Sequence, residues 1–88
     1  MSDIFNKLRA QLELQEWPSV YMFLFISPNN EDTLSKVTSM FDESAEVILK
    51  ESKNGRFVSV KAKELMMDVD SIIAKYEKVA KVKGVIAM

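Results

Sequence analysis

The sequence predicts a fold of the α+β class: a four-stranded antiparallel sheet with two helices on one face, preceded by an N-terminal helix. Three observations support this prediction. Strand-like and helix-like runs follow one another in the order strand, helix, strand, strand, helix, strand. An Asn-Gly pair separates the two middle strands, as in a tight hairpin. The chain has 88 residues, 48% of them hydrophobic, which is enough for one domain and too few for two.

The first predicted element is a helix over residues 3–15, inside an N-terminal segment of residues 1–16. Its apolar residues recur at helical spacing and are Ile4, Phe5, Leu8 and Leu12. Trp17-Pro18 ends this segment, because the residue before a proline is pushed out of the α region. We expect Trp17 to anchor the helix against the sheet.

Residues 19–27 predict a central strand that is followed by the breaker residues 28–30. The strand is apolar on both faces, which is typical of a strand covered on both sides. Val20, Met22, Leu24 and Ile26 point one way, and Tyr21, Phe23 and Phe25 point the other way. A helix over residues 31–41 comes next, with Asn30 as its N-cap.

The hairpin is the strongest local signal. Two strand-like runs, residues 45–52 and 57–63, flank the pair Asn54-Gly55, which favours a two-residue turn of type I′. That loop fixes the register of the two strands. One face then pairs Glu51 with Val58, Leu49 with Val60 and Val47 with Ala62, and the other pairs Ser52 with Phe57, Lys50 with Ser59, Ile48 with Lys61 and Glu46 with Lys63.

The last predicted helix covers residues 69–81. Asp68 can cap its start, and its apolar residues are Val69, Ile72, Ile73, Tyr76 and Val79. Gly84 breaks the helix, and residues 85–88 predict a short final strand.

Residues 18–88 therefore follow the βαββαβ order of the ferredoxin-like plait, in which right-handed crossovers place both helices on one sheet face. We expect that face to consist of Met22, Leu24, Ile26, Val47, Leu49, Val58 and Val60. The second face would then carry Tyr21, Phe23, Phe25, Ile48, Phe57, Ser59 and Lys61. These seven residues are the candidate surface for a partner or ligand, because an uncovered apolar patch usually marks an interaction site.

Composition narrows the chemistry. The chain contains no cysteine and no histidine, which removes thiolate metal sites, the usual general base and the commonest metal ligand. Glu31 and Asp32, like Asp68 and Asp70, are explained by helix starts more simply than by metal binding or acid–base catalysis. We therefore expect no catalytic residues, no metal and no cofactor. The first residues have no apolar core of signal-peptide length, so the expected location is the cytoplasm.

Several segments resemble the YbeD-like family of bacterial proteins. They are the hairpin residues 52–60, the helical residues 73–77, the closing residues 82–86 and the aromatic-Pro start at residues 17–23. The resemblance implies a ferredoxin-like plait akin to the ACT domains that regulate metabolic enzymes. It implies no catalytic residues.

Three interpretations of the second face remain open: the N-terminal helix covers it, a second copy covers it, or it is a binding platform. The leading hypothesis is a non-catalytic regulatory or adaptor module that binds a protein partner or a small metabolite, as a homodimer. The alternative is single-stranded RNA binding on the same face, because RNA-recognition folds share this topology and stack bases on aromatic residues. The pI of about 5.4 argues against nucleic acid, whose partners are more often basic.

Overall fold

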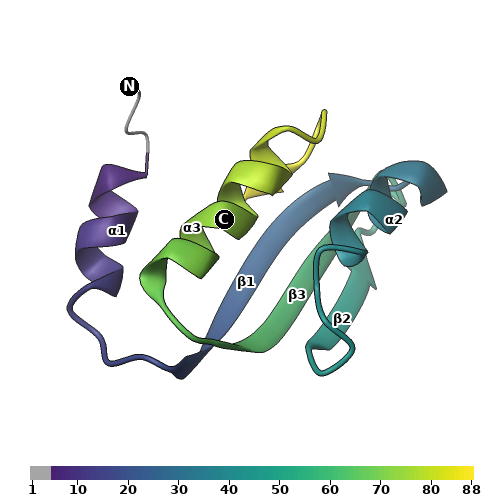
Figure 1. Cartoon of the computed structure of the whole chain (residues 1–88). Coiled ribbons are helices and arrows are strands. Elements are labelled where there is room, and N and C mark those ends of the chain that lie inside the picture. The colour runs from purple at the N-terminus through teal and green to yellow at the C-terminus, as the bar shows by residue number, and fades with distance from the viewer. Residues whose placement is uncertain (1–4) are drawn as a thin grey trace.

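The computed structural model describes residues 5–88, so the predicted helical role of Ile4 lies outside the described residues. Seven elements follow one another along the chain (Figure 1). They are α1 (Asn6–Leu12), β1 (Ser19–Pro28), α2 (Glu31–Thr38), β2 (Glu46–Glu51), β3 (Phe57–Met66), α3 (Val69–Ala80) and β4 (Ile86–Ala87). Each predicted element is present, although the helices, β2 and β4 are shorter than predicted and β1 and β3 are longer.

The four strands form one antiparallel sheet in the order β2-β3-β1-β4, which confirms the α+β class and is compatible with a ferredoxin-like plait. β1 and β3 pair along ten residues each, from Ser19 opposite Met66 to Pro28 opposite Phe57. This long central pair carries the short outer strands β2 and β4 at its two edges.

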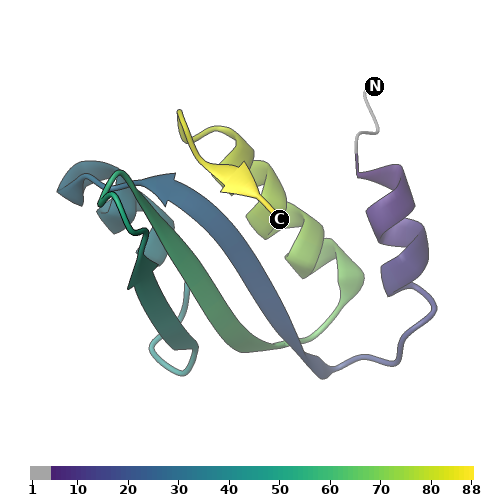
Figure 2. The ribbon, with the colours of Figure 1, turned by 180° about the vertical axis from the view of Figure 1, so that it is seen from behind.

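The helices leave one face of this sheet uncovered. α2 and α3 lie on one side, as Figure 1 shows, and the view from behind shows the strands with no helix in front of them (Figure 2). α1 lies beside α3 on the helix side. The Arg9 guanidinium contacts the Asp70 carboxylate at 2.6 Å, and the rings of Phe5 and Tyr76 are 6.1 Å apart. α1 therefore does not cover the second face of the sheet.

The core lies between the sheet and the helices and is rich in aromatic rings. Phe23 and Phe25 are fully buried, and their rings pack against those of Phe41 and Tyr76 at centroid distances of 5.5–6.2 Å. Burying one such side chain contributes about 1.5–3 kcal/mol. Trp17 links the end of α1 to the sheet, as expected. Its Nε1 donates to the Leu12 carbonyl at 2.9 Å, and its ring lies 6.4 Å from the Tyr21 ring on β1.

The hairpin confirms the predicted register and corrects the predicted turn. All six pairs from Glu46–Lys63 to Glu51–Val58 are present. However, no residue other than glycine has a positive φ among those described, whereas a type I′ turn needs positive φ at both central positions. Within the turn only Gly55 has a positive φ, of +72°. Its amide donates to the Ser52 carbonyl at 3.0 Å. The loop is thus a four-residue one, with the Asn54 side chain accepting from the Arg56 amide at 3.0 Å.

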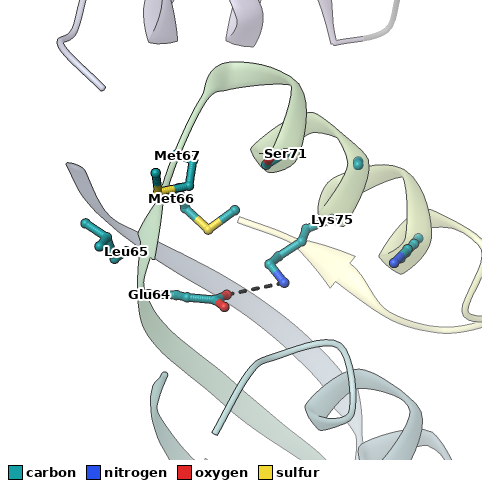
Figure 3. Close-up of a pocket in the computed structure, with 8 residues that line it drawn as sticks. Glu64, Leu65, Met66, Met67, Ser71 and Lys75 are labelled. Carbon is teal, nitrogen blue, oxygen red and sulfur yellow. Dashed lines mark ion pairs between the residues drawn. The ribbon is translucent and has the colours of Figure 1, made fainter. Parts of the chain in front are cut away.

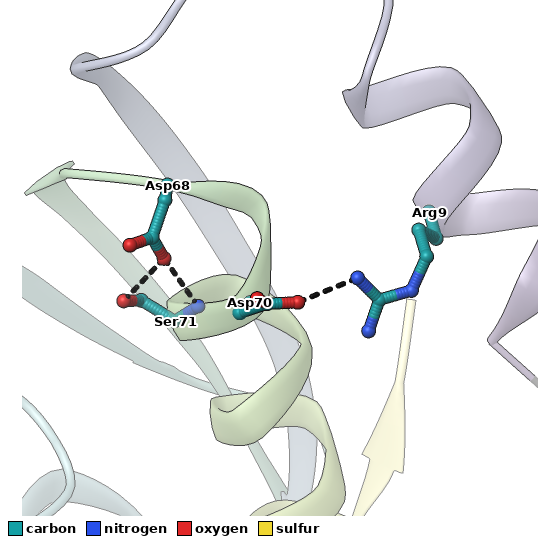
Figure 4. Close-up of polar contacts among 4 residues, drawn as sticks. All are labelled: Arg9, Asp68, Asp70 and Ser71. Atoms are coloured by element: carbon teal, nitrogen blue, oxygen red, sulfur yellow. Dashed lines mark hydrogen bonds and ion pairs between the residues drawn. The ribbon is translucent and has the colours of Figure 1, made fainter.

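Both predicted helix caps are confirmed. The Asn30 side chain accepts from the Thr33 amide at 2.7 Å. The Asp68 carboxylate accepts from the amide and the hydroxyl of Ser71 at 2.8 and 2.7 Å (Figure 4). Each contact satisfies an amide that the first helical turn leaves unpaired.

Candidate functional site

The register assigns the β1 side chains to the two faces, and the assignment differs from the predicted one. Residues directly opposite in an antiparallel pair share a face. Phe23 lies opposite Ala62 and Phe25 opposite Val60, and all four are buried against the helices. Tyr21 also lies on this side, because its hydroxyl is 2.8 Å from the Tyr76 hydroxyl on α3.

The prediction that Tyr21, Phe23 and Phe25 belong to an uncovered surface is therefore wrong. Both alternating sets of β1 are apolar, so alternation alone does not say which set faces the helices. The larger aromatic set fills the space under α3. Burial raises the pKa of Tyr76 well above its ordinary value of 10.0, and the hydrogen bond to Tyr21 raises it further.

We call the uncovered side the open sheet face. The prediction placed Ile48, Phe57, Ser59 and Lys61 there, and the register agrees. The residues of the open sheet face are Val20, Met22, Leu24 and Ile26 from β1, Glu46, Ile48 and Lys50 from β2, Phe57, Ser59, Lys61, Lys63 and Leu65 from β3, and Ile86 from β4. The predicted helix-side assignment of Met22, Leu24 and Ile26 is wrong for the reason just given.

Charge divides the open sheet face into two halves. The half formed by β1 and β4 carries no charged residue, and three of its side chains are at least 47% exposed: Val20, Met22 and Ile86. The half formed by β2 and β3 carries three lysines and one glutamate, which are Lys50, Lys61, Lys63 and Glu46. Because β3 lies next to β1, Lys61 and Lys63 directly border the apolar half.

A hollow of about 440 Å³ lies where the open sheet face meets the hairpin turn. It is lined by Ile26, Lys50, Glu51, Ser52, Lys53, Phe57 and Ser59. The Phe57 ring is 45% exposed, and Lys50 and Lys53 stand beside it. The hollow therefore combines an apolar wall with two lysines and one glutamate.

β2 is exposed on both faces. Val47 and Leu49 share the helix side with Ala62 and Val60, yet they are 36% and 50% exposed. Ile48, on the open sheet face, is 54% exposed. All six residues of this strand are exposed, and the strand order places it at the sheet edge. Its outward backbone groups and its apolar side chains are both accessible.

A second hollow, of about 310 Å³, lies between β3 and α3 and contains a partly buried ion pair (Figure 3). Lys75 Nζ is 3.2 Å from Glu64 Oε1, and the two side chains are only 17% and 11% exposed. The pair is an ion contact without hydrogen-bond geometry at that oxygen. Lys75 Nζ also donates to the Met40 carbonyl at 2.6 Å and lies 5.1 Å from the centre of the Phe41 ring. Sequence reasoning missed this pair.

The second hollow is better explained by structure than by chemistry. Glu64 and Lys75 offset each other's charge, and the Ser71 hydroxyl that lines the hollow donates to Asp68. The contacts tie β3, α3 and the residues after α2 together, which is a structural role. Within residues 5–88, no three His, Cys, Asp or Glu side chains are grouped so that they could hold a metal ion.

Comparisons with protein-family models, with curated proteins and with solved structures give no significant match. Across the described part of the chain, no helix has the length and apolar character needed to cross a membrane.

Proposed function

We propose that this protein is a non-catalytic regulatory or adaptor module that acts as a homodimer and binds a protein partner on the open sheet face. The observation that carries this proposal is the uncharged half of that face, bordered by Lys61 and Lys63. Exposed apolar surface that is rimmed by polar residues marks interaction sites. An apolar centre with charges at the border is also the ordinary anatomy of a protein interface.

The shape of the apolar half favours an amphipathic helix as the occupant. Two adjacent strands are about 5 Å apart, so the strip is about 10 Å wide with its side chains where β4 pairs with Phe25 and Ile26, and it continues along β1 as a single row of apolar side chains. An α-helix with its side chains has a diameter of about 10–12 Å. The opposite face of the same sheet is already covered by helices, and a partner helix on the open sheet face would complete a third layer.

Charge specifies the partner further. Lysines border the strip along β3, so carboxylates along one flank of the partner helix would meet them. The hollow beside Phe57 would receive one apolar side chain of that helix. We therefore propose an acidic amphipathic helix rather than a small metabolite, because the strip is elongated and extends well beyond the hollow.

The structure bears on the RNA alternative as well. Stacking platforms of RNA-recognition folds use aromatic residues on neighbouring central strands. With Tyr21, Phe23 and Phe25 on the helix side, Phe57 is the one aromatic residue of the open sheet face in the described part of the chain. This arrangement supports a protein partner over single-stranded RNA.

The fold and the location complete the proposal. The element order from β1 to β4 supports a ferredoxin-like plait. We also propose that the chain is a member of the YbeD-like family, which it resembles. A cytoplasmic location is consistent with a chain that contains no cysteine.

A pair of synthetic helical peptides tests the partner chemistry. Both carry the same apolar stripe, flanked by glutamates in one and by lysines in the other. Fluorescence anisotropy should detect binding of the acidic peptide, weakened by salt, and much weaker binding of the basic peptide. Met22→Asp should abolish binding. Leu14→Asp changes a side chain that is 87% exposed and lies after α1, so it is the matched control and should bind normally.

Three outcomes would overturn the proposal. Equal binding of the two peptides would remove the charge argument, and equal binding by the Met22→Asp and Leu14→Asp variants would place the site elsewhere. A single-stranded RNA oligonucleotide that bound more tightly than the acidic peptide, with the same sensitivity to Met22→Asp, would replace the protein partner by the RNA alternative.

A further inference from the structure

The outer edge of β2 has the geometry of an unfinished sheet. The Ser52 amide donates to the Phe57 carbonyl at 2.8 Å, so Ser52 and Phe57 form a hydrogen-bonded pair. Such pairs alternate along an antiparallel ladder. Lys50, Ile48 and Glu46 therefore direct their backbone groups toward β3. Val47 and Leu49 direct theirs outward, where no strand of the described sheet lies.

Natural edge strands are usually protected by prolines, bulges or inward charges, and β2 has few of these devices. Three consecutive apolar residues, Val47, Ile48 and Leu49, occupy its centre, and each is at least 36% exposed. The register with β3 runs without interruption from Glu46 to Glu51, so no bulge distorts the strand. An accessible, regular and apolar edge is a template for another strand.

The side-chain sequence of β2 is complementary to itself when two copies run antiparallel. With Ile48 opposite Ile48 of the second copy, Val47 lies opposite Leu49 and Glu46 lies opposite Lys50. Over residues 46–50 each pair is then apolar with apolar or acidic with basic. The Ile48 pair lies on the two-fold axis and occurs once, and the other two pairs occur twice. Val47 and Leu49 are also the residues whose backbone groups point outward, so this register forms the ladder hydrogen bonds.

Other registers fit less well. A shift by one residue in either direction would pair outward backbone groups with inward ones. In one of the two directions it would also bring Glu46 opposite Glu51. A shift by two residues in either direction would remove the pairing of Glu46 with Lys50 of the second copy. The two copies would also bind less well through their open sheet faces, because each face carries three lysines against one glutamate.

We propose that two copies of this chain associate through β2 in this register, forming one continuous eight-stranded sheet with all helices on the same side. The inference deepens the proposed function, since it rests on the homodimer named there and assigns its seam. The two open sheet faces then form one surface, and each copy keeps its own apolar half free for a partner helix.

Charge exchange at the seam tests the register. We expect wild-type protein to show a dimer in equilibrium with monomer by sedimentation over a dilution series. Glu46→Lys and Lys50→Glu should each raise the dissociation constant roughly tenfold, because each change turns two attractive cross-strand pairs into repulsive ones. The double variant Glu46→Lys/Lys50→Glu should return to within about twofold of wild type, since both pairs are restored with opposite sense.

A backbone variant tests the edge itself. Leu49→Pro removes an outward amide, and proline is tolerated at such positions of edge strands. It should yield a folded monomer by circular dichroism and sedimentation. Met22→Asp, on the open sheet face, should leave the dimer intact. Three results would overturn the inference. The wild-type protein could be a monomer at all concentrations, or the dimer could survive Leu49→Pro. The third is a double variant whose dissociation constant stays as high as that of the folded single variants.

The seam and the partner site fail independently in these experiments. A dimer that is lost on Met22→Asp but not on Leu49→Pro would move the seam to the open sheet face and overturn the β2 inference. Binding of the acidic peptide by monomeric Leu49→Pro protein would support the proposed partner site independently of the dimer. Sedimentation tests the β2 seam separately.

Discussion

Asp68 stabilises the start of α3 in a way that depends on pH. The hydrogen bond from the Ser71 hydroxyl, followed by that from the Ser71 amide, lowers the pKa of Asp68 from its ordinary value of 3.8. Because the folded-state pKa is the lower one, this stabilisation is complete above pH 3.8 and is lost as the pH falls through the folded-state pKa.

The variant Asp68→Asn isolates this contribution, because asparagine also caps helices but does not titrate. We expect it to unfold at a lower urea concentration than wild type at neutral pH, since the charge favourable to the helix dipole is lost. The difference should shrink as the pH falls below the ordinary aspartate range. A difference between the two urea midpoints that stays constant with pH would contradict this origin.

Single residues also show where sequence reasoning stops. Val20, Met22, Leu24 and Ile26 alternate with Tyr21, Phe23 and Phe25, and both sets are apolar. Period-two alternation predicts the strand but not its orientation, which depends on the pairing of Phe25 with Val60. For β2 and β3 the hairpin turn sets the register, and the sequence predicts it. β1 and β3 are far apart in the sequence and no turn joins them, so their register does not follow from a local pattern.

At the scale of elements, Lys75 connects three parts of the chain. Its ammonium contacts Glu64 on β3 and the Met40 carbonyl after α2, and it lies over the Phe41 ring. Removing it would leave the Glu64 carboxylate, only 11% exposed, without its ion partner. We expect Lys75→Met to lower the free energy of unfolding by about 2–3 kcal/mol, below the range for a fully buried pair.

Urea unfolding measures this effect, and Lys78→Met is the matched control. Lys78 lies on the same helix and lines the same hollow, but it is exposed. Its replacement should change the free energy of unfolding by less than about 0.5 kcal/mol. Equal effects of the two variants would show that the contacts of Lys75 add nothing beyond those of a surface lysine.

Elements differ in how far the sequence predicts them. The hairpin register followed from the spacing of two apolar runs around Asn54-Gly55, and it is correct although the turn conformation is not. Two- and four-residue loops give the same strand pairing here, so the register does not depend on the turn type. The Glu64–Lys75 pair, in contrast, joins a strand to a helix. No local pattern indicates that these two side chains meet, because their contact depends on how α3 crosses the sheet.

At the scale of the whole molecule, an 88-residue chain leaves two apolar regions exposed, the uncharged half of the open sheet face and the edge of β2. A chain of this size buries only about 60–65% of the surface of its unfolded form. Association through β2 buries further apolar area and pairs the outward backbone groups of the edge. Folding and association are then linked, since a ligand or subunit that binds only the folded chain stabilises it.

This linkage predicts that the melting temperature of the wild-type protein rises with protein concentration. A tenfold increase adds about 1.4 kcal/mol per dimer, shared by two chains. A domain of this size shifts by about 4–8 °C per kcal/mol, so the midpoint should rise by about 3–6 °C for each tenfold step above the dissociation constant. Circular dichroism melts over a hundredfold range of concentration measure this rise.

Two variants are the controls. Leu49→Pro should give a midpoint that does not change with concentration, because it removes the seam without touching the core. The double variant Glu46→Lys/Lys50→Glu should restore the wild-type dependence of the midpoint on concentration. A wild-type midpoint that is independent of concentration would contradict the linkage and with it the dimer.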